Sequence, residues 1–163
     1  MTVRPAREAD APAIRRLLIA AFGGEAEADL VDRLRAVDDL ALALVAEDDG
    51  VSGYAGFPQL TVDEDGRTCD AAGLAPLAVM PGRQKQGIGS VLIREGHRLL
   101  AQRGCPLVFV LGDPGYYTRF GYDLATAAPF ASPYTGPHFM ALRLNENAPR
   151  VGKVRYPAAF DGL

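Results

Sequence analysis

Residues Gln84 to Ser90 combine glycines, amide side chains and a lysine at the junction between an apolar run and an amphipathic helix. The surrounding stretch, Leu77 to Leu100, reads LAVMPGRQKQGIGSVLIREGHRLL. The first backbone N–H groups of a helix have no partner within the helix, and glycines let a phosphate approach them closely. The pattern therefore predicts either an anion site or an ordinary tight turn between a strand and a helix.

Two common phosphate-binding patterns fit this loop poorly. In the P-loop pattern, Gly82 and Gly87 have the right spacing, but Ile88 stands where a lysine must neutralise the phosphates. In the dinucleotide pattern, Gly87 and Gly89 occupy the first two glycine positions, whereas Leu92 occupies the third. An enzyme that uses ATP or a nicotinamide dinucleotide is therefore disfavoured.

A third pattern, [QR]-x-x-G-x-[GA], matches Gln84 to Gly89 at every fixed position. On this motif, and on the order of elements from Thr2 to about Leu144, the chain resembles the GNAT superfamily of acyl-CoA-dependent N-acetyltransferases. The closing stretch, YPAAFDGL, looks like the tail of a bacterial subgroup. In that family the loop wraps the pyrophosphate of coenzyme A, so the resemblance implies acetyl-CoA as co-substrate. The residues that it implies around the phosphates are Arg83, Gln84, Lys85, Gln86, Gly87, Ile88, Gly89 and Ser90.

A second motif, Tyr117 to Tyr122, fits the family pattern Y-x-[KR]-x-G-[FY]. The resemblance implies that Tyr117 lies near the thioester sulfur and acts as a general acid toward the departing thiolate, with Phe120 also on the cofactor side. A tyrosine packed only for its ring is the alternative. Many relatives carry an asparagine in this short helix, where the chain has Asp113, which either replaces it at the cofactor or caps the turn. We expect Tyr116 to be mainly structural.

The apolar run before the loop contains Pro76, which has no N–H to donate in a central strand. In the family, two parallel strands splay apart at this place and the pantetheine arm inserts between them. The resemblance then implies that the backbone of Leu77, Ala78 and Val79 contacts the cofactor. It also implies that the Val79 N–H stabilises the oxyanion that forms from the thioester carbonyl. An edge strand or a bulge would tolerate the proline equally well.

The motifs lie within a regular order of elements. Turn residues at 48–50 and 63–66 separate three strand-like segments, and we expect Asp10 to cap the first helix. The expected strands are 2–6, 40–47, 51–62, 68–79, 106–112 and 138–144, and the later expected helices are 23–37 and 88–103. Residues 1–163 are expected to form one α/β (α+β) domain. Its sheet is mixed and mostly antiparallel, with helices on both faces and a splayed parallel strand pair.

The composition narrows the class of protein. Of 163 residues, 48% are apolar and 23% charged, as in globular proteins, and a net charge of -3 predicts no bulk attraction to nucleic acid or membrane. The polar start, MTVRPAREAD, is unlike a signal peptide. Cys69 and Cys105 lack the spacing of metal ligands, so we expect reduced thiols, no metal and a cytoplasmic location.

The expected function is transfer of an acetyl group from acetyl-CoA to a small-molecule or peptide amine, by direct attack in a ternary complex. The alternative is a non-catalytic module of the same fold that senses acyl-CoA or binds a protein partner. The amine is left open, because the small and apolar residues at 125–137 favour a neutral or modestly apolar acceptor, whereas the acidic residues of the chain favour a cationic amine. The oligomeric state is open too, with a homodimer as one option.

The sequence assigns no general base. Four acidic residues on or beside the expected central strands are equally explained as turn or surface residues. His97 is expected to be solvated, and His138 opens the last strand, where it could face the substrate. The four acids are Glu47, Asp63, Glu64 and Asp70.

Overall fold

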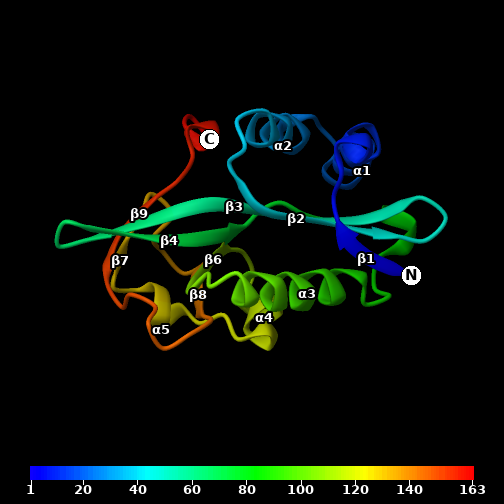
Figure 1. Cartoon of the computed structure of the whole chain (residues 1–163). Helices are drawn as coiled ribbons and strands as arrows, with labels where there is room; N and C mark the ends of the chain where they lie inside the picture. Colours follow the sequence, from blue (N-terminus) through cyan, green and yellow to red (C-terminus); the bar gives the residue numbers. More distant parts are fainter.

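The computed structural model describes all residues, 1–163, as one open sheet with helices on both faces (Figure 1). The strands are β1 (Thr2–Pro5), β2 (Leu40–Glu47), β3 (Val51–Glu64), β4 (Arg67–Leu74), β5 (Leu77–Val79), β6 (Leu107–Leu111), β7 (Phe130–Ala131), β8 (Phe139–Arg143) and β9 (Gly152–Arg155). The α-helices are α1 (Ala11–Phe22), α2 (Ala26–Ala36), α3 (Ile88–Gln102), α4 (Pro114–Tyr117) and α5 (Leu124–Ala127). Four 3₁₀ turns are η1 (Glu8–Asp10), η2 (Pro81–Arg83), η3 (Thr118–Phe120) and η4 (Ala158–Phe160).

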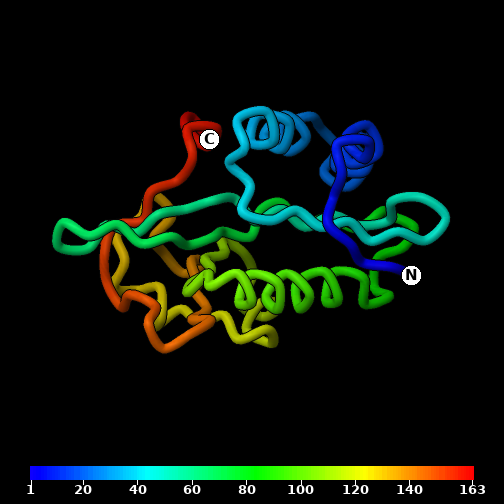
Figure 2. The backbone as a smooth tube through the Cα atoms, viewed as in Figure 1, coloured from blue at the N-terminus to red at the C-terminus, as the bar shows by residue number.

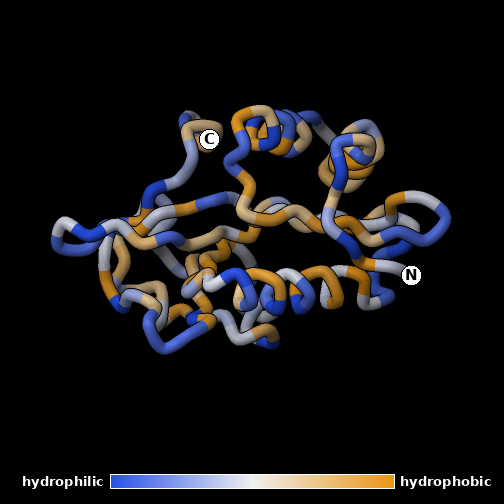
Figure 3. Tube along the Cα trace, in the orientation of Figure 1, coloured by the Kyte–Doolittle hydropathy of each residue, from blue (hydrophilic) through white to orange (hydrophobic).

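The sheet is organised around β3, whose two halves have different neighbours. Its first half pairs with β2 and β5, and its second half pairs with β4 and β9, all antiparallel. The main order is β1-β2-β3-β4-β6-β8, with parallel pairing between β4 and β6 and between β7 and β9. The two turns that join β3 to β2 and to β4 are hydrophilic (Figure 3). The predicted mixed, mostly antiparallel sheet is confirmed.

The long strand expected at 68–79 is in fact two strands, because Ala75 and Pro76 interrupt it. The parallel pairing of β4 with β6 ends at Leu74, opposite Val110. Beyond the interruption β5 pairs only with β3, so β5 and β6 are no longer joined by a ladder. Proline lacks the N–H that a central ladder needs, which explains why the interruption falls here. The sheet is therefore open between β5 and the end of β6.

The helices form two layers, with α1 and α2 on one face of the sheet and α3 and α4 on the other (Figure 1). Helix α5 packs through Ala127 against Phe109 and Phe139, on the face of β6 and β8 opposite to α3. The tube in Figure 2 shows the C-terminal segment returning to the α2 face, where η4 contacts α2. Helix α3 buries Leu92, Ile93 and Leu100 against the sheet, and α1 buries Leu17 and Leu18 on the other side. No helix combines the length and apolar character that crossing a membrane requires.

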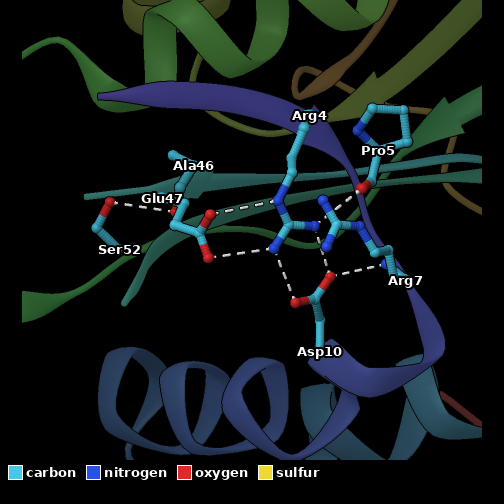
Figure 4. A network of polar contacts seen from close by, with 7 residues as sticks. All are labelled: Arg4, Pro5, Arg7, Asp10, Ala46, Glu47 and Ser52. Atoms are coloured by element: carbon cyan, nitrogen blue, oxygen red, sulfur yellow. Dashed lines mark hydrogen bonds and ion pairs between the residues drawn. The ribbon is translucent and has the colours of Figure 1, made fainter. Parts of the chain in front are cut away.

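The start of the chain is fixed by an ion-pair network (Figure 4). The guanidinium of Arg4 donates to both carboxylate oxygens of Asp10 at 2.8 and 2.9 Å, and it also pairs with Glu47 at 3.2 Å. Asp10 further accepts from the Arg7 N–H at 2.7 Å. The expectation that Asp10 caps α1 through its side chain is wrong, because the carboxylate is held by these two arginine residues instead.

Other element boundaries differ in small ways. The second helix begins at Ala26 rather than at Gly23, and α3 ends at Gln102, two residues before Gly104, whose φ is 83°. Strand β9, which no pattern in the sequence predicted, pairs with β3. It directs the last residues of the chain back over the sheet (Figure 2).

Candidate active site

The N-terminus of α3 presents an uninterrupted run of unpaired backbone donors. Gly87, with a φ of 84°, is the residue before the helix, and no side chain caps it. The Val91 N–H is the first that finds a helical acceptor, the Gly87 carbonyl at 3.1 Å. None of the N–H groups from Gln84 to Ser90 donates a hydrogen bond within the protein. These donors meet at the positive end of the α3 dipole, which suits an anion.

Strand β5 turns part of its backbone toward the opening in the sheet. The Met80 N–H donates to Ser52 at 2.8 Å, and Pro76 accepts from Gly56 at 3.0 Å. Because bonding positions alternate along an antiparallel strand, the peptide groups of Leu77 and Val79 point away from β3. No second strand pairs with them there. The Val79 carbonyl accepts from the Gln84 side chain at 3.2 Å, and the N–H groups of Leu77 and Val79 face the opening.

These two features line one cleft of about 480 Å³. The sequence-predicted cofactor residues that it brings together are Leu77, Ala78, Val79, Gln84, Lys85, Gly87, Ile88, Gly89 and Ser90. Two residues that were not predicted complete the lining, Tyr116 and Arg119. The lining holds two cationic side chains, Lys85 and Arg119, and no carboxylate.

Tyr116 and Arg119 line the cleft from the segment that follows β6, and the Tyr116 hydroxyl lies 3.0 Å from the place of a Cβ at Gly89, in the first turn of α3. The Arg119 guanidinium lies 5.0 Å from the centre of the Tyr116 ring, a cation–π arrangement. The expectation that Tyr116 is mainly structural is incomplete, because this residue lines the cleft. The signal for Arg119 was present, since it occupies the basic position of the Tyr117–Tyr122 motif. Nothing in the sequence distinguished the two adjacent tyrosines by the direction of their rings.

Tyr117, the predicted acid, is not among the residues that line this cleft. Its ring packs against Gly112 and stands edge-on to Tyr116 and Tyr122, with centroids 5.0 and 6.0 Å away. Its hydroxyl has no hydrogen-bond partner in the protein, and it is not among the fully buried, unpaired polar atoms. Burial raises the pKa of Tyr117 to about 12, so the phenol keeps its proton at neutral pH.

Four other predicted cofactor residues also lie outside the lining. Arg83 pairs with Asp48 at 3.0 Å and donates to Gln86 at 3.3 Å, which ties the loop to the β2–β3 turn. The Asp113 carboxylate accepts from the Gly115 N–H at 2.9 Å, so it caps the turn, which is the second of its two expected roles. Phe120 is buried in the α3-side core, where its ring faces the guanidinium of Arg94 at 5.0 Å.

The acidic residues considered as bases lie elsewhere. Glu47 pairs with Arg4, and Asp63 pairs with Arg155 and accepts from Thr68. No group of three or more His, Cys, Asp and Glu side chains is placed to hold a metal ion. Cys69 and Cys105 are both free thiols.

The two histidines have different surroundings. The Nδ1 atom of His138 lies 3.2 Å from the Gly112 carbonyl, on an exposed side chain. The expectation that His97 is solvated is wrong, because its ring is largely buried and its Nε2 atom lies 2.7 Å from the Tyr122 hydroxyl. Burial, with a smaller effect of Arg94, lowers the pKa of His97 to about 4.

Comparison with known proteins agrees with this geometry. A family model described as "Acetyltransferase (GNAT) domain" matches residues 2–125. The chain is 42% identical over 127 residues to the uncharacterized N-acetyltransferase YhbS of Escherichia coli, covering 77% of this chain and 75% of that protein. It is 38% identical over 134 residues to the uncharacterized N-acetyltransferase YjhQ of the same species, covering 80% and 74%.

Two solved structures resemble the whole chain. A GNAT family acetyltransferase from Brucella melitensis, in complex with acetyl-CoA, has a TM-score of 0.82 at 38% identity, covering 98% of this chain and 97% of that one. YhbS from Escherichia coli, in complex with CoA, has a TM-score of 0.88 at 36% identity, covering 98% and 91%. With the family model and these relatives in agreement, the chain belongs to the GNAT acetyltransferase family.

Proposed function

We propose that this chain transfers the acetyl group of acetyl-CoA to a primary amine, with both substrates bound together. The observation that carries the proposal is the run of unpaired N–H groups from Gln84 to Ser90, which opens on the same cleft as the free backbone of β5. Two relatives of known structure bind acetyl-CoA or CoA, which supports the same cofactor here.

The chemistry of the cleft suits the diphosphate of coenzyme A. The N–H donors supply directed hydrogen bonds, and the helix end carries roughly half a positive charge. Lys85 and Arg119 add two full positive charges, and no carboxylate in the lining opposes them. Arg83 is engaged with Asp48, so its charge acts on the loop more than on the ligand.

At the other end of the cleft, β5 is suited to hold the thioester. The pantetheine arm takes the place of the missing strand partner, because the outward N–H groups of Leu77 and Val79 donate to it and to the thioester carbonyl. As the amine nitrogen attacks, the carbonyl oxygen gains negative charge, and the Val79 N–H stabilises it. When the carbon–sulfur bond breaks, the electron pair leaves with the sulfur, and the proton of the attacking nitrogen passes to solvent water.

Tyr117 acts on the leaving thiolate as a hydrogen-bond donor. Its pKa of about 12 lies well above the value of about 8.5 of an ordinary thiol, so full transfer of its proton would be uphill by about 5 kcal/mol. A hydrogen bond that strengthens as charge develops on sulfur avoids that penalty. The Tyr117 hydroxyl has no partner in the protein, which favours this role over that of a packed ring in a non-catalytic module.

We also propose that the enzyme works in the cytoplasm, which its two free cysteines favour. Neither Cys69 nor Cys105 lines the cleft, so direct attack by the amine is preferred over a covalent enzyme intermediate.

The test is thiol release from acetyl-CoA with a panel of primary amines, in the wild type and in Gly87→Glu. The added carboxylate enters the proposed phosphate site, so binding of acetyl-CoA and turnover should both be lost. Gly104→Glu is the matched control, because Gly104 has nearly the same φ, 83°, and open space around it at the far end of α3. Equal loss of cofactor binding in both variants, or unchanged binding in Gly87→Glu, would refute the proposal.

A further inference from the structure

A second cavity lies at the carboxyl ends of β4 and β6, where the parallel pair stops. Its volume is about 250 Å³. The lining includes Leu74 and Ala75 at the end of β4, and Phe109 and Leu111 from β6. The remaining wall comes from distant parts of the chain, chiefly Tyr134, Tyr156 and Phe160.

This cavity and the cofactor cleft open on the same break in the sheet from opposite faces. Ala75 lines the cavity, whereas Leu77, two residues further along, lines the cleft. The cleft lies on the α3 face, and the cavity lies under η4, which packs on α2 at the other face (Figure 1). A group bound in the cavity is therefore next to the point where β5 presents its outward N–H groups.

The cavity walls carry no ionised side chain. None of the lining residues is Asp, Glu, Lys, Arg or His. The aromatic wall is ordered by edge-on contacts, since the rings of Tyr134 and Tyr156 are 4.9 Å apart and those of Tyr156 and Phe160 are 5.5 Å apart. Another cavity of the protein is larger, about 560 Å³, but charged side chains such as Glu8 and Asp32 line it. It also touches neither β4 nor β6, so it does not reach the break in the sheet.

The aromatic wall is fixed by pairing between strands far apart in the sequence. Strand β9 pairs with β3, with Arg155 opposite Thr61, so Tyr156 leaves the sheet directly over the cavity. An ion pair between Arg155 and Asp63 reinforces this register. Phe160 follows in η4 and covers the cavity from the α2 side.

Resting on the transferase function proposed above, we propose that this cavity binds the group attached to the acceptor amine, and that the acceptor is an apolar, arylalkyl-type amine. An apolar cavity of roughly 150 Å³ accepts benzene, so the larger volume here suits a phenyl ring with a short alkyl stem. A second positive charge, or a carboxylate beside the amine, finds no charged side chain in the lining to pair with and is selected against.

The experiment compares kcat/KM for 2-phenylethylamine, ethylamine and spermidine in the wild type. Burial of the phenyl ring should raise kcat/KM for 2-phenylethylamine over ethylamine by about 10- to 100-fold. Spermidine should have the lowest kcat/KM of the three amines, because its additional positive charges would have to enter the apolar cavity. A wild type that prefers spermidine, or that does not distinguish 2-phenylethylamine from ethylamine, overturns the proposal.

Variants at Phe160 locate the effect. Phe160→Ala should lower kcat/KM for 2-phenylethylamine by about 10-fold and change that for ethylamine by less than about 2-fold. Phe160→Leu keeps part of the apolar volume, so its kcat/KM for 2-phenylethylamine should lie between those of the wild type and Phe160→Ala. Phe22→Ala removes a 46% exposed phenylalanine at the end of α1, and it should change neither value. An equal effect of Phe160→Ala on both amines contradicts the assignment.

A binding measurement separates this inference from the transferase function. Calorimetric titration of 2-phenylethylamine into the CoA complex should give a dissociation constant that Phe160→Ala weakens by about 10-fold. If no amine releases thiol, the transferase proposal fails, yet this titration still decides whether the cavity takes an apolar amine. Absence of binding to the wild type overturns the cavity assignment alone.

Discussion

The ring of Tyr117 lies directly against the backbone of Gly112, in the space that a Cβ at position 112 would occupy. The two residues are five apart in the chain, at either end of the turn that carries α4 away from β6. Glycine at 112 thus decides where the phenol of Tyr117 can be.

Gly112→Ala is expected to displace Tyr117 while leaving the phosphate loop intact. We expect kcat to fall by about 10- to 100-fold, because small displacements of a reacting group have effects of that size. The dissociation constant of acetyl-CoA should change by less than about 3-fold. Gly115→Ala is the control, since its Cβ meets only the Asp113 carboxylate, at 3.3 Å. Unchanged kcat in a folded Gly112→Ala protein would argue against a role for Tyr117.

Tyr117→Phe should lower kcat by about 10²-fold and leave acetyl-CoA binding intact, because only the donor to the thiolate is lost. Burial raises the pKa of Tyr117 to about 12, so its protonated form persists through the accessible alkaline range. The kcat profile of the wild type should therefore show no loss of activity from Tyr117 up to about pH 10. Tyr116→Phe keeps the ring under Arg119 and serves as control. A larger loss of kcat in Tyr116→Phe would transfer the donor role to Tyr116.

Lys85→Ala and Arg119→Ala should each weaken acetyl-CoA binding by about 3- to 10-fold, because each removes one positive charge from the cleft. Calorimetric titrations at low and high salt should show a smaller salt dependence in both variants than in the wild type. Lys153, the other lysine of the chain, lies on β9 outside the cleft, so Lys153→Ala is the matched control. Equal weakening by all three substitutions would indicate a general charge effect.

His97 should make stability fall as the solution is acidified. Its pKa is lowered from 6.5 to about 4 in the folded protein, so between these values the unfolded chain binds a proton that the folded protein does not. The contribution of the buried, neutral His97 to the free energy of unfolding is fully present above about pH 6.5. It is lost progressively toward pH 4, by up to about 3 kcal/mol. Denaturant unfolding of His97→Gln should show a flatter pH dependence. His138→Gln, at the exposed histidine, should not, and a wild-type profile that is flat in this range would contradict the burial of His97.

Asp10→Asn should destabilise the fold by about 2 kcal/mol at neutral pH, because it breaks the bidentate pair with Arg4. The hydrogen bond from Arg4 lowers the pKa of Asp10 from 3.8 to about 2. That stabilisation is present above pH 3.8 and is lost as the pH falls toward 2. Glu95→Gln, in the exposed pair with Arg98, should change the free energy of unfolding by less than about 0.5 kcal/mol. Similar effects of both substitutions would show that burial of the Arg4 network adds nothing.

The sequence by itself determined the elements whose causes are local. The apolar spacing of α3, the polar turns around β3 and the glycine loop before α3 all depend on residues a few positions apart. The loop also marked most of the cofactor cleft, because its backbone donors follow from the start of a helix wherever that helix packs. The family motif around Tyr117 includes the basic residue Arg119, but the motif does not indicate that Arg119 lines the cofactor cleft.

Tertiary structure decided what depends on contacts between distant residues. Only the pairing of β5 with β3 directs the Leu77 and Val79 backbone into the opening, and only packing against Gly112 fixes the place of the Tyr117 ring. The burial of His97 against Tyr122, 25 residues away, has the same origin. The apolar cavity needs Tyr156 and Phe160 to be carried by β9 over the end of β4. Such contacts are set by the packing of the whole chain, because burial and pairing at long range carry no periodic signal in the residues that take part.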